Sequence, residues 1–236
     1  VNEFETNGVF TAGGNVSVDV SFETQTSRFD DDNQMSITGN VDYMGGDGRD
    51  EVLLNETTTI GGNVTVDLAD NTVGGTQYMW LNKSDASIGG NVEVYSTAAT
   101  FPDDFQDVAG AQVGGDVTVD LGDGPNQADF LGTYTGTVGT YQGGSGVDEV
   151  TVNAVAASMN FEVDLAQAAD DFTLGASTSL ASLVVKFGCG DEDGFTDLLG
   201  EPYPFPVSLL SACATFDISK VFTDLAISDV SYSFDC

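Results

Sequence analysis

The sequence contains no histidine, and only five of its 236 residues are lysine or arginine. Without histidine, the chain lacks the commonest general base, the usual activator of Ser and Cys nucleophiles, and the imidazole ligands of zinc sites. With so few basic residues, it also lacks the phosphate contacts that dominate nucleic-acid binding. We therefore expect a protein that binds no nucleic acid and has no enzymatic activity.

Long apolar runs and cysteines are scarce as well. No stretch approaches the roughly 20 apolar residues that cross a bilayer, so we expect no membrane insertion. Cys189, Cys213 and Cys236 are the only cysteines. In a secreted chain, three cysteines predict one disulfide and one spare thiol. The sequence does not indicate which two of them pair. A first residue Val1 instead of Met fits a mature secreted protein, although an excised segment would look the same.

Acidic residues, by contrast, are abundant. The 38 Asp and Glu residues give a net charge of −33, whereas 41% of the chain is hydrophobic. This apolar content predicts a folded core and not a disordered tail. The charge attracts divalent cations, basic partners or salt counterions, and it repels anionic membranes. We expect a secreted or cell-surface protein whose surroundings reduce this self-repulsion through salt or calcium.

A recurring phrase of the form Gly-Gly-Asn-Val-x-Val-Asp organises most of the chain. Its apolar residues alternate, as do Val64, Val66 and Leu68, which is the period of a half-buried strand. One phrase recurs about every 20 to 30 residues, the spacing of stacked structural repeats. The sequence therefore predicts an all-β fold, a parallel β-helix (β-solenoid) of about eight coils. The anchoring residues of the phrases are Asn15, Asn40, Asn63, Asn91, Asp116 and Asn160.

Stacking of the phrases has three expected consequences. The anchoring amides form a hydrogen-bonded ladder, in which Asp116 substitutes for asparagine. The Gly-Gly pairs allow a positive φ and close backbone approach at a corner. The outward aspartates of the phrases form an acidic stripe along one face of the solenoid, where a solvated surface is the default interpretation. These aspartates are Asp19, Asp67, Asp120 and Asp164.

The phrase fades after Lys186, which divides the chain into two parts. Residues 1–186 are expected to form the solenoid repeats. Residues 187–236 contain the three cysteines and a proline-rich run at 202–206, and we expect a C-terminal cap or assembly segment there.

Two segments match the nonapeptide Gly-Gly-x-Gly-x-Asp-x-U-x, which binds calcium in tandem arrays. They cover residues 45–53 and 143–151, and a degenerate third copy surrounds residue 123. Structural calcium is the one cofactor that this pattern predicts. Because the copies are isolated, the alternative is that Gly and Asp only form a corner. The candidate calcium ligands are Asp47, Asp50, Asp123 and Asp148.

Acidic clusters at 30–32, 103–104 and 170–171 raise a different possibility. Paired carboxylates serve as the acid and base of glycosidases, so a carbohydrate-active or carbohydrate-binding β-helix is an alternative. Such a site requires a cleft and an aromatic side chain that stacks on a sugar, and Trp80 is the only tryptophan. The clusters are also typical of solvated loops.

The repeated phrases and the Gly-Asp turns together resemble the large β-strand-repeat surface proteins of bacteria, including adhesin-like and RTX-like repeat families. The likeness covers residues 9–186. It implies an extracellular protein of adhesion, surface layers or fibres. We expect self-association into a filament, layer or surface fibre, with a glycan or cell-surface partner as a further option. Another alternative is a calcium-dependent adhesin module of a longer protein.

Overall fold

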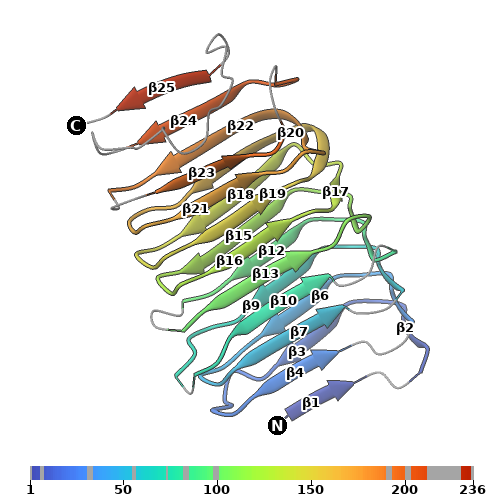
Figure 1. Cartoon of the computed structure of the whole chain (residues 1–236). Coiled ribbons are helices and arrows are strands. Elements are labelled where there is room, and N and C mark those ends of the chain that lie inside the picture. Colours follow the sequence, from blue (N-terminus) through green and yellow to red (C-terminus); the bar gives the residue numbers. More distant parts are fainter. Residues whose placement is uncertain are drawn as a thin grey trace.

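In the computed structural model, parallel strands stack coil upon coil into a β-solenoid of about eight turns (Figure 1). The structure describes residues 2–5, 8–30, 34–54, 57–72, 74–81, 85–97, 101–189, 193–199, 203–211 and 230–234. Within these ranges the chain forms strands and no helix, so there is also no helix that could span a membrane. The predicted all-β parallel solenoid is confirmed.

The strands form two sheets, one of nine strands and one of sixteen. The nine-stranded sheet takes one strand from each coil: β1 (Asn2–Glu5), β4 (Ser27–Asp30), β7 (Asp50–Leu54), β10 (Gln77–Leu81), β13 (Asp103–Asp107), β16 (Gln127–Phe130), β19 (Glu149–Val152), β21 (Asp171–Leu174) and β23 (Gly194–Asp197). Every neighbouring pair is parallel, as expected for strands that pair between coils.

The sixteen-stranded sheet contains two bands that meet at the Gly-Gly corners. The first band consists of β2 (Phe10–Ala12), β5 (Met35–Ile37), β8 (Thr58–Ile60), β11 (Ser87–Ile88), β14 (Gln112–Val113) and β17 (Thr133–Tyr134). The second consists of β3 (Val16–Asp19), β6 (Val41–Met44), β9 (Val64–Asp67), β12 (Val92–Tyr95), β15 (Val117–Gly122), β18 (Val138–Gly143), β24 (Val207–Ser211) and β25 (Val230–Phe234). The long strands β20 (Val155–Asp164) and β22 (Ser179–Phe187) take part in both bands.

The core is built from columns of inward side chains, as the alternation predicts. Val64, Val92 and Val117 are paired in register on adjacent coils, and each is 0% exposed. Where the column reaches Gly139, the ring of Phe161 on the next coil occupies the space that a Cβ would need. The hydrophobic ladder therefore continues through a degenerate repeat because one large ring compensates for a missing side chain.

Beyond the first coil, the Gly-Gly corners pack closely but do not use positive φ. Positive φ occurs at other glycines, such as Gly74 and Gly122, and not at the corner pairs. A Cβ on Gly90 would collide with Asn63 Oδ1 and would lie 2.8 Å from the carbonyl carbon of Gly62. The expectation of close approach is met, whereas the expectation of positive φ is wrong at these corners.

Parallel pairing continues beyond Lys186. In the second part of the chain, β23 adds to the nine-stranded sheet, and β24 and β25 add to the sixteen-stranded sheet. The described residues of the expected cap therefore extend the stack of strands.

Candidate functional site

A column of buried polar side chains runs along the start of the nine-stranded sheet, and we call it the acidic column. Its members occupy equivalent positions at the entry to successive strands. All but the last are at most 3% exposed. The members are Ser27, Asp50, Gln77, Asp103, Asn126, Asp148, Asp170 and Asp193.

Burial is the main influence on the carboxyl groups of this column. Removal from water raises the pKa of Asp50 to about 6, and it raises the pKa values of Asp103, Asp148 and Asp170 to about 7. The charge of Asp170 raises the pKa of Asp148 further. The charged forms of these groups are therefore costly at neutral pH unless something neutralises them.

Asp50, the aspartate of the first Gly-Gly-x-Gly-x-Asp turn, has protein donors around it. The Tyr43 hydroxyl donates to Asp50 Oδ1 at 2.7 Å, and the Gly46 N–H donates to Oδ2 at 3.1 Å. The Gln77 amide lies 3.5 Å from the same Oδ2. In this copy of the motif, the aspartate closes the corner by accepting hydrogen bonds from its own coil and from Gln77 of the next coil.

Asp148, the aspartate of the second turn, has a different environment. Tyr141 occupies the place of Tyr43, seven residues before the aspartate. Hydrogen bonds from Asn126 and Tyr141 lower the pKa of Asp148, but they are less regular in geometry than those around Asp50. The Asp148 N–H donates to Asp170 Oδ1 at 2.9 Å, and Asp170 Oδ2 has no hydrogen-bond partner.

Asp47 and Asp123, the other two predicted calcium ligands, are exposed at corners. The Asp47 carbonyl accepts a hydrogen bond from the Thr72 N–H at 3.0 Å, and Asp123 Oδ1 accepts one from the Ser145 N–H, also at 3.0 Å. Over the described ranges, no three acidic, His or Cys side chains lie close enough to hold a metal ion. The structure does not bring the four predicted residues together.

The anchoring asparagines do form a ladder between coils. Asn15 Oδ1 accepts a hydrogen bond from the Asn40 N–H at 3.0 Å, and the contact repeats at the same distance along the phrases to Asp116. Asp116 Oδ1 in turn accepts from the N–H groups of the following coil. The ladder differs from the expected one because its acceptors bind backbone N–H groups and not the next amide. At its far end, Asn160 instead accepts from the Ser182 hydroxyl at 2.7 Å.

Each outward aspartate accepts a hydrogen bond from the backbone N–H two residues ahead. Asp67 Oδ1, for example, accepts from the Ala69 N–H at 2.9 Å, and Asp19, Asp120 and Asp164 make the same contact. A groove of about 190 Å³ lies on this face between Tyr95 and the carboxylates of Asp120, Glu162 and Asp164.

The acidic clusters do not converge on one site. Asp103 is buried in the column, whereas Asp104 is the next residue of the same strand and lies on its opposite side. Asp170 and Asp171 also follow each other at a strand entry, so each pair divides between the inside and outside of the solenoid. Asp31 and Asp32 lie outside the described residues.

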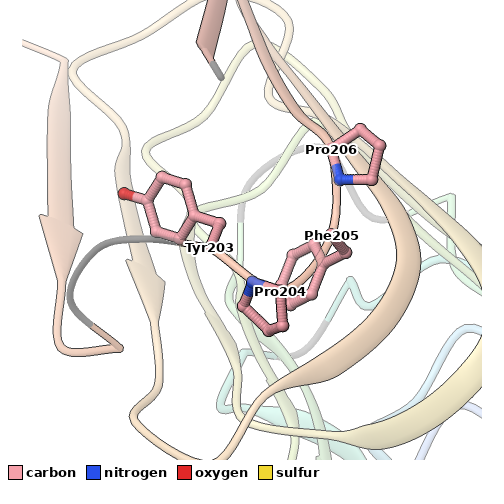
Figure 2. Close-up of a pocket in the computed structure, with 4 residues that line it drawn as sticks. All are labelled: Tyr203, Pro204, Phe205 and Pro206. Carbon is pink, nitrogen blue, oxygen red and sulfur yellow. The ribbon is translucent and has the colours of Figure 1, made fainter. Parts of the chain in front are cut away.

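The C-terminal segment contains a small apolar pocket of about 300 Å³. It is lined by Tyr203, Pro204, Phe205 and Pro206, which lie just before β24 (Figure 2). The Tyr203 hydroxyl donates to Asp197 Oδ2 at 2.7 Å. Because the lining offers few polar groups, this pocket has little with which to orient a ligand.

Cys189 takes part in a disulfide. Cys213 and Cys236, the other two predicted positions, lie outside the described residues.

The first coil exposes part of its inner face. Its inward residues Val16 and Val18 are only partly buried, whereas the equivalent valines of interior coils are at most 1% exposed. Gly14 has no atom near its Cβ position, unlike Gly90 at an interior corner. Strands β1, β2 and β3 are terminal in their sheets, so their outer edges face away from the stack.

Comparison with family models, with curated proteins and with solved structures finds no match to this chain. The resemblance to bacterial surface repeats therefore stays a prediction.

Proposed function

We propose that this protein is an extracellular structural β-solenoid that assembles end to end into a filament or surface layer. The observation that carries the proposal is the open first coil, with half-buried inward valines and three terminal strands. An exposed strand edge with apolar residues behind it is a template for the addition of another strand.

Both ends of the solenoid present terminal strands. β1, β2 and β3 are terminal at one end, and β23 and β25 are terminal in the two sheets at the other end. Stacking one molecule on the next would keep all strands parallel. Contacts between two different ends of the same molecule generate open filaments when they do not close into a ring. The net charge of −33 opposes such stacking, so assembly should require salt or cations.

The backbone at the open edge indicates a specific test. The Val16 N–H donates to the Asn40 carbonyl of the second coil at 2.8 Å. Since N–H groups alternate in direction along a parallel strand, the Ser17 N–H points to the open side. Ser17→Pro removes this donor and places a ring at the edge without removing a contact to the second coil.

We expect the wild-type protein to form filaments or sheets by negative-stain microscopy at high salt. Ser17→Pro should remain monomeric in light scattering, while Ser17→Ala, which keeps the N–H, should assemble as the wild type does. Dispersed wild-type monomers at every salt concentration would contradict the proposal. They would favour the groove beside Tyr95 as a carbohydrate site, the second function that the sequence suggests.

A further inference from the structure

A groove of about 320 Å³ lies on the outside of the nine-stranded sheet, over the acidic column. The residues directly before each column member form one wall, and the residues directly after form the other. The first wall is Thr76, Pro102, Pro125 and Val147, the second is Asp104, Gln127 and Glu149, and Asp103 and Asn126 lie between them. The strands concerned, β10, β13, β16 and β19, lie side by side (Figure 1). The groove therefore follows the solenoid axis from coil to coil.

The two walls of this groove differ in chemistry. The first is mostly apolar, and its Val147 exposes 52% of its surface. The second contains two carboxylates, Asp104 and Glu149, with the Gln127 amide in register between them. Since neighbouring strands lie about 4.8 Å apart, the two carboxylates are about 10 Å apart along the axis. A ligand that matches both walls has an apolar middle and a positive charge at each end.

Neither carboxylate of the groove has a basic partner among the described residues. The described Lys and Arg side chains form their ion pairs with other acidic residues. Burial raises the pKa of Asp104 to about 6, while a hydrogen bond from the Trp80 indole lowers it. Asp104 Oδ1 is shielded from water and makes no further regular hydrogen bond within the described ranges. A cation from solution would therefore stabilise the charged form of Asp104.

The preceding coil shows how this face of the sheet binds a cation. The guanidinium of Arg49 lies 5.5 Å from the centre of the Tyr78 ring, and its Nη2 lies 2.6 Å from Glu51 Oε1. The Arg49 Nε donates to the Thr76 carbonyl at 2.8 Å, at one end of the groove. In the register of the sheet, Tyr78 lies between Glu51 and Asp104. The carboxylate on one side of the ring thus has a cation from the chain itself, whereas the carboxylate on the other side lines the groove.

We propose that this groove binds one aliphatic dication, a free diamine or guanidino-amine, with its charged ends at Asp104 and Glu149 and its carbon chain along Pro125 and Val147. Carboxylates form charge-assisted hydrogen bonds with ammonium and guanidinium groups, and the apolar wall removes the methylene groups from water. A metal ion would use the carboxylates but not this wall. The groove lies on the side of the solenoid, so the site is independent of the ends that we propose to assemble.

Isothermal titration calorimetry of the full chain with putrescine, at constant ionic strength, tests the site. Wild type should bind one equivalent, about fivefold more tightly than it binds butylamine, which carries a single charge. Asp104→Asn and Glu149→Gln should each weaken putrescine binding by about the same factor, because each removes one ion pair. Asp42→Asn removes a charge from an exposed position on the other sheet and should leave the affinity unchanged.

A second set of titrations separates the carbon chain from the charges. Val147→Ser keeps both carboxylates, so it should weaken putrescine binding about twofold and leave Mg²⁺ binding unchanged. Agmatine in place of putrescine distinguishes the two ligand types, since the tighter of the two identifies the preferred cationic group. Weak binding of several equivalents, equal in wild type and in both carboxylate variants, would assign the cations to the acidic surface as a whole and overturn the proposal. Equal affinities for putrescine and butylamine would also overturn it.

Discussion

Two polar columns connect the same coils, and they differ in burial and charge. The asparagine ladder lies at partly or fully exposed corners and is neutral except at Asp116, whereas the acidic column is buried and carries carboxyl groups. In both, a side-chain oxygen accepts a backbone N–H of an adjacent coil, as Asn63 does from Asn91 and Asp170 does from Asp148. The first column should hold coils together regardless of the medium, whereas the second makes the same kind of contact sensitive to protons and cations.

The largest expected effect is a dependence of stability on pH. Desolvation raises the pKa of Asp103 to about 7, and burial also raises the pKa of Asp107, at the other end of the same strand, to about 7. The pKa of an aspartate in an unfolded chain is about 3.9, so the folded state binds these protons more tightly. The resulting stability is fully present below about pH 4 and is lost as pH rises through about 7.

We therefore expect these two groups together to lower the free energy of unfolding in EDTA by about 5 kcal/mol between pH 5 and pH 8, at about 1.4 kcal/mol per pKa unit for each group. Urea unfolding at the two pH values measures this difference. Asp103→Asn should reduce the total fall by about 2.5 kcal/mol, the share of this one group. A flat profile, or greater stability at pH 8, would show that the buried aspartates remain charged at little cost.

The sequence predicts the asparagine ladder better than it predicts the acidic column. The asparagine ladder was predictable because one residue type recurs in a constant phrase, although its hydrogen bonds to the backbone depend on corner geometry. The acidic column mixes Ser, Asp, Gln and Asn at the entry to strands whose flanking turns differ in length. Only the register of the nine-stranded sheet aligns these residues.

Two residues of the acidic column could be predicted from the sequence. The calcium motif identified Asp50 and Asp148, but it could not separate them, because the two turns share the same pattern. Their difference comes from the neighbouring coils, which supply Gln77 beside Asp50 and Asp170 beside Asp148. A tyrosine seven residues before each aspartate was the one additional signal of a buried pair.

A smaller loss of stability is expected when a methyl group is added beside the asparagine ladder. Gly90→Ala places a methyl group against Asn63 Oδ1 and the Gly62 backbone, which should cost about 2 kcal/mol of unfolding free energy. Gly14→Ala is the matched control at the open first coil, where no atom lies within 4 Å of the new Cβ. Its cost should stay below about 0.5 kcal/mol. Equal costs in urea unfolding would mean that the corners do not limit the packing of coils.

The smallest effect should come from removing one contact of the ladder. Asn63→Ala leaves the Asn91 N–H without its acceptor, and since this corner is partly exposed, water can replace the lost bond at a cost of about 1 kcal/mol. Asn63→Asp should cost less, because Asp116 makes the equivalent contacts at 2.7 Å and 2.9 Å with a carboxylate. Hydrogen exchange at the Asn91 amide should accelerate in the alanine variant alone.

The same substitution also tests whether the collision at Gly90 involves this side chain. Because the new methyl group of Gly90→Ala meets Asn63 Oδ1 as well as backbone, adding Asn63→Ala should recover part, but not all, of the stability that Gly90→Ala loses. Strictly additive losses in the double variant would place the collision entirely in the backbone, and the ladder would then have no part in setting how closely the coils approach.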